Sequence, residues 1–304
     1  MSAERILFIK LGKSGLWEKE CIESGTLRFG FREAIHSDCV NGDWKAVTKH
    51  YIQVEGKKPG KATEITNQIK SFYEEPETTI WITFYGDSLW WCKARKEVKV
   101  IRDGYKERKV VGAWSNCDMK GNQLSLSTIS GKLLQTRGFR GTICQPSALE
   151  YARRRILGEV LPEVTTAIEQ RKRFVDSILP VIQGLSPQDF EILVDLIFRN
   201  GGWQRSGVVG GTEKSIDLDL YSPITREQIA IQIKSKSSQK EFDSYLETFK
   251  EMQGYDRFFY FVHTGGEELK AFDDQIKIDI VAGPSLADLT VRAGLVDWII
   301  EKAS

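Results

Sequence analysis

A carboxylate and a Gln-x-Lys tripeptide lie close together in this chain, each inside an apolar run. Asp217 belongs to KSIDLDLYS, and Gln232 and Lys234 follow fifteen and seventeen residues later in IAIQIKSKS. In a strand, alternation puts Gln232 and Lys234 on one face, and Asp217 and Asp219 share a face of their own strand. The carboxylate, the amide and the backbone oxygen of Ile233 are suited to a hard divalent cation, and the lysine to a place beside the attacking water. This spacing is typical of a metal-dependent nuclease core.

The apolar neighbours of these residues separate this reading from a simpler one. An aspartate and a lysine on adjacent strands are most often solvated surface residues. Here the flanking apolar positions are Ile216, Leu218 and Leu220 on one strand and Ile229, Ile231 and Ile233 on the other. The alternation sends one face of each strand into a core and presents the polar face as a set. We therefore favour the nuclease interpretation, with a degenerate nuclease fold used only for binding as the alternative.

The order of the surrounding motifs resembles a known family. A helix beginning with DFE, a GGW turn, a GG loop, an I-D pair and Q-I-K follow one another in SPQDFEILVDLIFRNGGWQRSGVVGGTEKSIDLDLYSPITREQIAIQIKS. This stretch, extended to Phe261, resembles an Mrr-like restriction endonuclease domain of the PD-(D/E)XK superfamily. The resemblance implies that Asp217 and Lys234 are catalytic and that Glu191 of the lead helix supports the metal. It also places Gln232 in a position that is usually acidic. The loop departs from the family pattern, because GGTEKSID stands where G-x-D-G-G-I-D is common.

Length and composition describe a chain of about two domains. Of the 304 residues, 41% are hydrophobic and 28% are charged, as in ordinary soluble globular proteins. No apolar run approaches the roughly 20 residues that span a bilayer. The first residues predict a strand rather than a signal peptide. We therefore expect a cytoplasmic protein. Five cysteines without a CxxC pair and three scattered histidines argue against a zinc site.

Charge is distributed unevenly along the chain. Residues 1–150 carry 24 lysines and arginines against 18 aspartates and glutamates, and the remainder carries 19 against 24. A basic first half beside an acidic second half suits a protein that binds DNA with one part and cleaves it with the other.

The first domain, residues 1–146, is expected to be mostly β. Short aromatic and β-branched runs are broken by Gly, Asp and Asn in ILFIKLG, TLRFGF, TTIWITFYGDSLWWCKA, KEVKVIRD and RKVVGAWS. FYGDSLWW predicts a hairpin that turns at Gly86, Asp87 and Ser88. TEITNQIKSFYEE has helical spacing and a threonine N-cap signal. These elements predict a small mixed β-barrel with α+β composition.

The remaining residues are expected to be helical and then α/β. Residues 147–183 predict a helical linker of two helices, the second beginning at Pro162. Residues 184–304 predict an α/β nuclease domain: a helix, the Asp217 strand, the Lys234 strand, a helix, two further strands, and one closing helix over LADLTVRAGLVDWIIEKAS.

Tryptophan is dense in the first domain, with six of the eight residues of this type. Most tryptophans fill cores. However, Trp90 and Trp91 are adjacent on a strand and must point to opposite faces, so both cannot enter one barrel interior. At least one of them is either covered by a helix or exposed for stacking.

The first domain resembles the PUA superfamily with its EVE and YTH branches, in the stretches FIKLGKSGLWEKECIESGTLRFGF, TIWITFYGDSLWWCKA and GAWSNCD. The resemblance implies a PUA-like domain that holds a modified or flipped base between aromatic side chains. Such a pocket needs flat stacking surfaces and hydrogen bonds to the base edge. Trp17, Trp90 and Trp114 are the candidates for its walls. Arg137 and Arg140 are candidates for phosphate contacts, with solvated loop arginines as the alternative.

Together these features predict a modification-dependent restriction-type endonuclease acting on double-stranded DNA. The first domain would read a modified base, and the second would cut with Mg²⁺, for which Mn²⁺ would substitute. Asp217, Gln232 and the backbone of Ile233 would hold the metal, and Lys234 would orient or deprotonate the water. Asp219 is the substitute ligand if the strand register is shifted. One such domain cuts one strand, so a double-strand break would need a homodimer or paired binding. The alternatives are a structure-specific repair or recombination nuclease, and a non-enzymatic nucleic-acid reader, including one for RNA.

Overall fold

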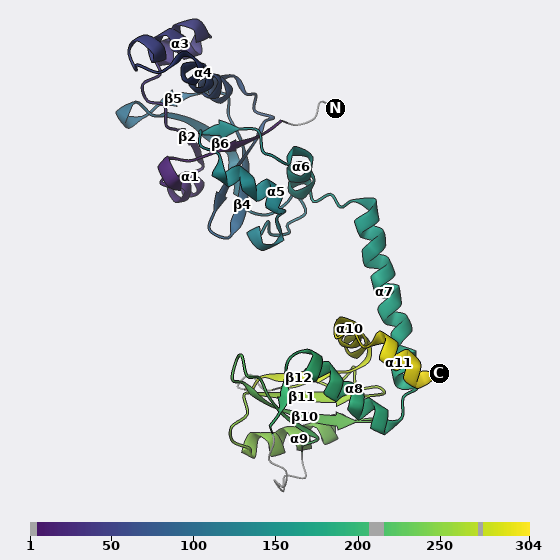
Figure 1. Ribbon diagram of the computed structural model, residues 1–304. Helices are drawn as coiled ribbons and strands as arrows, with labels where there is room; N and C mark the ends of the chain where they lie inside the picture. Colours follow the sequence, from purple (N-terminus) through teal and green to yellow (C-terminus); the bar gives the residue numbers. More distant parts are fainter. Residues whose placement is uncertain (1–4, 207–215, 273–275) are drawn as a thin grey trace. The chain divides into compact units, whose positions relative to one another are not determined.

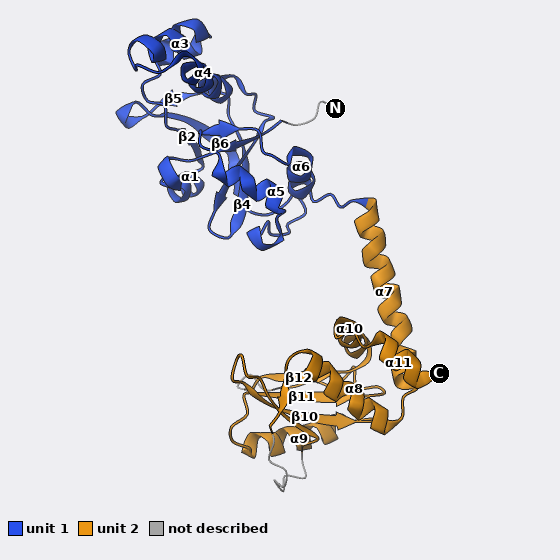
Figure 2. Cartoon of the chain, viewed as in Figure 1, with its two compact units in different colours: residues 1–161 blue, residues 162–304 orange. Residues whose placement is uncertain are grey.

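Two segments of the chain fold separately in the computed structural model (Figure 2). Unit 1 comprises residues 1–161 and unit 2 comprises residues 162–304. The structure describes residues 5–206, 216–272 and 276–304. The GG loop that the sequence places before Asp217 lies outside these described residues.

The segment expected to be a linker is shared between the two units. Helix α6 (Leu149–Leu157) buries Ala152 and Ile156 completely in a core of unit 1. Helix α7 (Pro162–Gln183) begins at Pro162 as predicted, and its last turns bury Ile178 and Ile182 in the core of unit 2. Because both helices contribute core residues, the boundary in the structure falls between residues 161 and 162.

Unit 1 is built on a curled half-barrel sheet, in which the outer strands are β2 and β7 and no closure is formed among the described residues. The strand order is β2-β6-β4-β3-β1-β7, with β5 paired to β6; β1 runs parallel to β3 and the other pairings are antiparallel. The strands are β1 (Ile6–Ile9), β2 (Thr26–Phe29), β3 (Ile80–Tyr85), β4 (Ser88–Ala94), β5 (Lys99–Val100), β6 (Lys106–Ser115) and β7 (Ile143–Cys144). The predicted hairpin is confirmed as β3 and β4, and Gly86 adopts the positive φ of 55° that its tight turn requires.

The helices of unit 1 cover both faces of this sheet. They are α1 (Glu18–Ser24), α2 (His36–Val40), α3 (Trp44–Gln53), α4 (Pro59–Glu74), α5 (Gly131–Leu134) and α6. Helices α1 to α4 enclose one core, and α5 and α6 enclose a second core on the other face. The helical spacing predicted before Phe72 is confirmed by α4, although this helix starts at Pro59 rather than at a threonine cap. Helices α1 to α3 were not predicted.

Trp90 and Trp91 point to opposite faces of β4, as predicted, and each packs against a different core. The indole N–H of Trp90 donates to the carbonyl oxygen of Tyr85 at 3.1 Å, and that of Trp91 donates to Cys117 O at 2.7 Å. Helices on both sides therefore explain how adjacent tryptophans are accommodated on one strand.

Unit 2 contains a five-stranded sheet in the order β12-β11-β10-β9-β8. Its strands are β8 (Gln204–Arg205), β9 (Leu218–Tyr221), β10 (Gln228–Lys234), β11 (Arg257–Val262) and β12 (Ile278–Val281). Strands β10, β11 and β12 are parallel, whereas β9 pairs antiparallel with β10 and places Leu218 opposite Ile231. This register fixes which polar residues of β9 and β10 can meet.

The sheet of unit 2 lies between two layers of helices (Figure 1). Alternation along β9 and β10 divides their side chains between these layers. Leu218, Leu220 and Ile231 enter the core formed with α7, α8 (Pro187–Asn200), α10 (Gly283–Arg292) and α11 (Val296–Ala303). Ala230 and its neighbours on the other face pack against α9 (Gln239–Glu251). The closing segment forms two helices rather than the predicted one, because Gly294 takes a left-handed φ of 72° between them.

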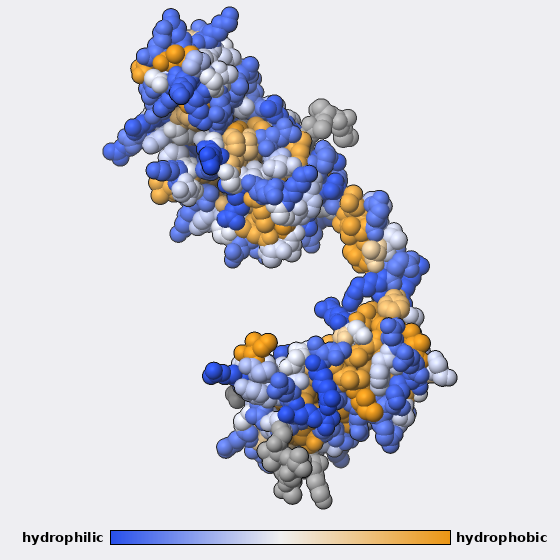
Figure 3. All heavy atoms as spheres, viewed as in Figure 1, coloured by the Kyte–Doolittle hydropathy of each residue, from blue (hydrophilic) through white to orange (hydrophobic). Residues whose placement is uncertain are grey.

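Helix α7 exposes apolar side chains along its first turns, where Val164 is 45% and Ile168 is 62% accessible. Apolar atoms are visible along this helix in Figure 3. Within the described ranges, no helix, α7 included, is long and apolar enough to span a membrane.

Candidate functional site

Asp217 lies immediately before β9, opposite Gln232 of β10. Its backbone N–H donates to the carbonyl of Ile231 at 3.0 Å, which continues the strand pairing by one residue. The Oδ2 atom of Asp217 accepts hydrogen bonds from Nε2 of Gln232 and, at 2.6 Å, from the backbone N–H of Ile233. The structure thus brings together three of the residues that the sequence singled out.

Two further oxygen atoms belong to the residues of this cluster, one on the side chain of Gln232 and one on the backbone of Ile233. Oε1 of Gln232 is buried and has no hydrogen-bond partner among the described residues. A buried polar atom without a partner costs free energy, so such an atom needs an explanation. The N–H and C=O of one strand residue face the same neighbouring strand, and the carbonyl of Ile233 therefore also faces the Asp217 side. The carboxylate, the amide oxygen and this carbonyl form a set of the kind that Mg²⁺ or Ca²⁺ prefers.

The donor set contains one carboxylate. Nowhere in residues 5–206, 216–272 or 276–304 do three or more His, Cys, Asp or Glu side chains gather as a metal site. Magnesium commonly keeps several waters and binds through one or two carboxylates together with substrate phosphates. The residues present fit a cation held in this way, and they do not fit a closed structural metal site.

Lys234 ends β10 and shares the face of Gln232, about 7 Å further along the strand. Its ammonium donates to the hydroxyl of Tyr245 at 2.5 Å, lies 4.3 Å from the centre of that ring, and is 3.6 Å from the carboxylate of Glu241. Burial acts to lower the pKa of Lys234, but the hydrogen bond to Tyr245 and the charge of Glu241 outweigh it and raise the pKa above 10.5. Lys234 is therefore an ammonium at neutral pH.

Tyr245 and Glu241 were not identified from the sequence. Both lie on α9, four residues apart and hence on one face of the helix. Ser238 caps this helix and accepts a hydrogen bond from the backbone of Glu241 at 3.3 Å, which fixes the first turn beside the end of β10. The signal available was the Ser-x-x-Glu start of the helix that follows Gln-x-Lys, with a tyrosine one turn later.

Two further candidates lie apart from this cluster. Glu191 belongs to α8, which packs on the opposite face of the sheet; its side chain is exposed and no hydrogen bond or ion pair joins it to the cluster in the described structure. Asp219 shares the face of Asp217 but accepts a hydrogen bond at 3.1 Å from Gln228, which lies four residues before Gln232 on β10. In this strand register Asp217, and not Asp219, lies beside Gln232 as a candidate metal ligand.

The cluster lies in a segment that matches a family model. Residues 182–289 match the Mrr restriction endonuclease family. The match covers about a third of the chain and includes β9, β10, α8 and α9. It implies a PD-(D/E)XK-like fold for this part of unit 2 and supports a restriction-type endonuclease with DNA as its substrate. No curated protein and no solved structure matched the chain.

The Mrr match does not reach unit 1, and no comparison supports the resemblance of residues 1–146 to the PUA superfamily. The structure shows how buried the three candidate tryptophans are. Trp114 is only 6% exposed in a core, and its indole N–H donates to Thr26 O at 3.0 Å. Trp17 and Trp90 pack against the same core but stay partly exposed. A role of these residues in base binding stays a prediction. Arg137 and Arg140 are exposed.

The core position of Trp114 predicts a large loss of folding stability when its side chain is truncated. Replacement by Ala should destabilise unit 1 by about 3–5 kcal/mol, the usual cost of truncating a buried aromatic residue. Denaturation followed by tryptophan fluorescence measures this loss, since six of the eight tryptophans belong to unit 1. Trp17→Ala is the comparison, and its effect should be smaller because Trp17 is partly exposed. A stable Trp114→Ala protein with weakened DNA binding would contradict the core assignment.

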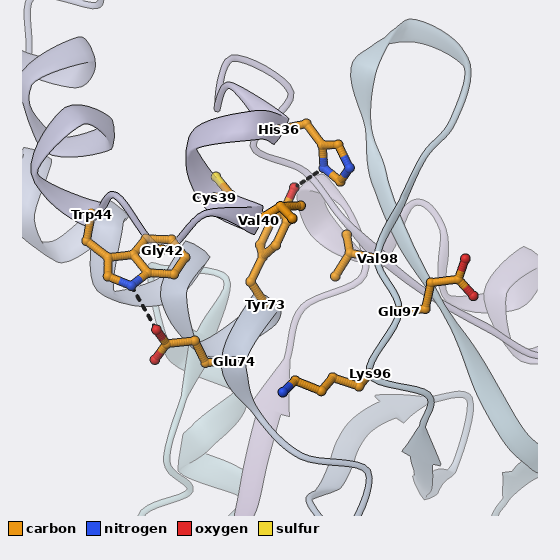
Figure 4. A pocket seen from close by; sticks show the side chains of 10 residues that line it. All are labelled: His36, Cys39, Val40, Gly42, Trp44, Tyr73, Glu74, Lys96, Glu97 and Val98. Atoms are coloured by element: carbon orange, nitrogen blue, oxygen red, sulfur yellow. Dashed lines mark hydrogen bonds between the residues drawn. The ribbon is translucent and has the colours of Figure 1, made fainter.

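A cavity of about 750 Å³ opens beside α2 and α4 (Figure 4). Two polar pairs are already formed in its lining: the Tyr73 hydroxyl and His36 Nδ1 lie 2.9 Å apart, and the Trp44 indole donates to Glu74 at 2.8 Å. Glu74 and Glu97 outnumber Lys96 in its lining. Two carboxylates repel a phosphate backbone, so this cavity is poorly suited to DNA.

Proposed function

We propose that this protein is a Mg²⁺-dependent DNA endonuclease of the restriction type, in which unit 2 cuts and unit 1 reads a modified base. The observation that carries the first half is the meeting of Asp217, Gln232 and Ile233 at the end of β10, inside the segment that matches the Mrr family. The unpartnered Oε1 of Gln232 supports a cation at the same point.

Each residue has a role in this proposal. Asp217, Gln232 Oε1 and the Ile233 carbonyl would hold the cation, which when bound supplies an acidified water and offsets charge on the scissile phosphate. The short hydrogen bonds to Asp217 orient its carboxylate before any cation arrives. Lys234 stays protonated and stabilises the charge that develops on the phosphate oxygens. Its raised pKa favours this electrostatic role over proton abstraction.

The net positive charge of unit 1 supports its role as the part that binds and reads DNA. With the boundary after residue 161, unit 1 carries 27 lysines and arginines against 19 aspartates and glutamates, and unit 2 carries 16 against 23. An acidic nuclease unit attracts duplex DNA poorly on its own. A surplus of positive charge in the attached unit would supply the sequence-independent part of DNA binding.

Matched DNA substrates test this proposal. The protein is incubated with Mg²⁺ and duplexes of one sequence that contain cytosine, modified cytosine, adenine or modified adenine. We expect cutting of one modified duplex at least tenfold faster than its unmodified counterpart, and no cutting in EDTA. Equal cutting of all duplexes would favour a structure-specific nuclease, and binding without Mg²⁺-dependent cutting would favour an inert reader. Either result would overturn the proposal.

A further inference from the structure

A second cavity of unit 1 lies where β1 and β3 end. It measures about 350 Å³, within the range of small-ligand sites, and its lining is Phe8, Lys10, Ser14, Gly15, Glu18, Phe84 and Arg137. Phe8 and Phe84 form an apolar floor, with ring centres 5.8 Å apart; both belong to a core of unit 1, and only 4% and 6% of their surface is exposed. Charged and hydroxyl groups surround this floor, so the cavity combines an apolar surface with polar groups that can define an orientation.

A strained turn shapes one wall of this cavity. Gly12, Ser14 and Gly15 all have positive φ, at 85°, 55° and 78°, and Ser14 is one of three residues other than glycine with this geometry in the described structure. Strain of this kind persists where the surroundings enforce it and is frequent at ligand sites. A Cβ atom at Gly15 would lie 2.6 Å from the carboxylate of Glu18. The glycine therefore leaves the room that this carboxylate occupies.

Glu18 is the polar group that this turn presents to the cavity. It is half-buried, and its carboxylate has no hydrogen-bond partner among the described residues of the chain. Burial raises its pKa above 4.5, although the Arg137 charge acts in the opposite direction. Because this carboxylate keeps contact with solvent, a ligand that donates a hydrogen bond would replace water there.

Cations lie beside the same opening. The guanidinium of Arg137 is 5.9 Å from the Phe84 ring, and the Lys10 ammonium donates to the carbonyl of Phe139 at 2.5 Å. These groups suit phosphates that flank a base turned into the cavity. In contrast to the larger cavity of Figure 4, cations outnumber the single carboxylate here.

We propose that this cavity holds one base extruded from DNA, with Glu18 accepting a hydrogen bond from an exocyclic amino group and Phe8 and Phe84 contacting the ring. The base is one that carries an exocyclic amino group, as cytosine, adenine and guanine do and thymine does not. The inference rests on the proposed function, because it locates the reading site that function requires.

Binding without cleavage tests the inference. Affinities are measured by fluorescence anisotropy in EDTA for duplexes of one sequence whose target base, opposite an abasic site, is cytosine, 5-methylcytosine, adenine, N6-methyladenine or thymine. The wild-type protein should bind at least one amino-bearing base better than thymine. Glu18→Ala should weaken binding of that duplex roughly 10- to 100-fold and leave the thymine duplex unchanged, as loss of a charge-assisted hydrogen bond implies.

Matched variants separate the possible outcomes. Glu23→Gln, on the same helix but outside the cavity and exposed, should behave as wild type. Glu18→Gln and Glu18→Ala should melt within a few degrees of wild type, since no hydrogen bond is lost. If both Glu18 variants keep the preference for the amino base, the cavity is not the site, although the reading function stands. If the wild-type protein binds all five duplexes equally, the cavity inference and the reading function both fail, while Mg²⁺-dependent cutting still decides the nuclease.

Discussion

Asp217→Asn is expected to slow Mg²⁺-dependent DNA cleavage roughly a thousandfold, because a bound divalent cation supplies several kcal/mol of transition-state stabilisation. The substitution keeps the size of the side chain and one acceptor for the Ile233 N–H, so folding should be preserved. Single-turnover cleavage measures the rate, and anisotropy in EDTA measures DNA binding, which should stay within a few-fold of wild type.

Asp219→Asn is the matched control for this prediction. Asp219 lies on the same strand and the same face, but it is hydrogen-bonded to Gln228 rather than to Gln232. Its replacement should leave the cleavage rate within about threefold of wild type, since Asp219 is joined to Gln228 and not to the cluster around Asp217. If Asp219→Asn were inactive and Asp217→Asn active, the strand register described here could not position the cation.

Lys234→Gln is expected to lower the cleavage rate by roughly 10²–10³-fold, the usual effect of removing one preorganised group that stabilises developing charge. Binding of uncut DNA should change little, because one cation among many phosphate contacts is lost. Since the pKa of Lys234 is raised above 10.5, the ammonium persists as the pH rises, and its contribution should be lost only above that value.

Two variants identify the source of this effect. Lys236→Gln removes an exposed positive charge two residues beyond Lys234 and should leave cleavage unchanged. Tyr245→Phe removes the hydroxyl that Lys234 contacts but keeps the ring, and should slow cleavage about tenfold through poorer positioning of the ammonium. Wild-type rates in Lys234→Gln would remove this residue from the mechanism.

Local alternation was sufficient to predict the centre of the candidate site. The pattern in β9 and β10 gives two strands with one apolar face each, and the structure pairs them so that Asp217 meets Gln232. Strand period and adjacency in the chain determine this contact, because both strands belong to one hairpin. The start of α7 at Pro162 followed from equally local rules.

Contacts between distant elements were not predictable in this way. The partners of Lys234 depend on how α9 docks on the sheet, and the position of Glu191 depends on which face α8 covers. The roles of the tryptophans could not be separated from the sequence, since an aromatic residue in a core and one in a ligand pocket have the same local sequence. The short helices α1 to α3 were missed because few residues carry their periodicity, and packing rather than intrinsic propensity stabilises them.

The two cores on either side of the unit 1 sheet have an evolutionary consequence. Trp90 and Trp91 are each anchored in a different core, so side chains on both faces of the sheet contribute to folding stability. Substitutions there carry a folding cost, whereas the segments that connect the strands can change length and composition at little cost. If unit 1 reads modified bases as proposed, recognition of new modifications would therefore arise by divergence of loops such as Gly12–Gly15, while the sheet and its tryptophans stay the same across descendants of this protein.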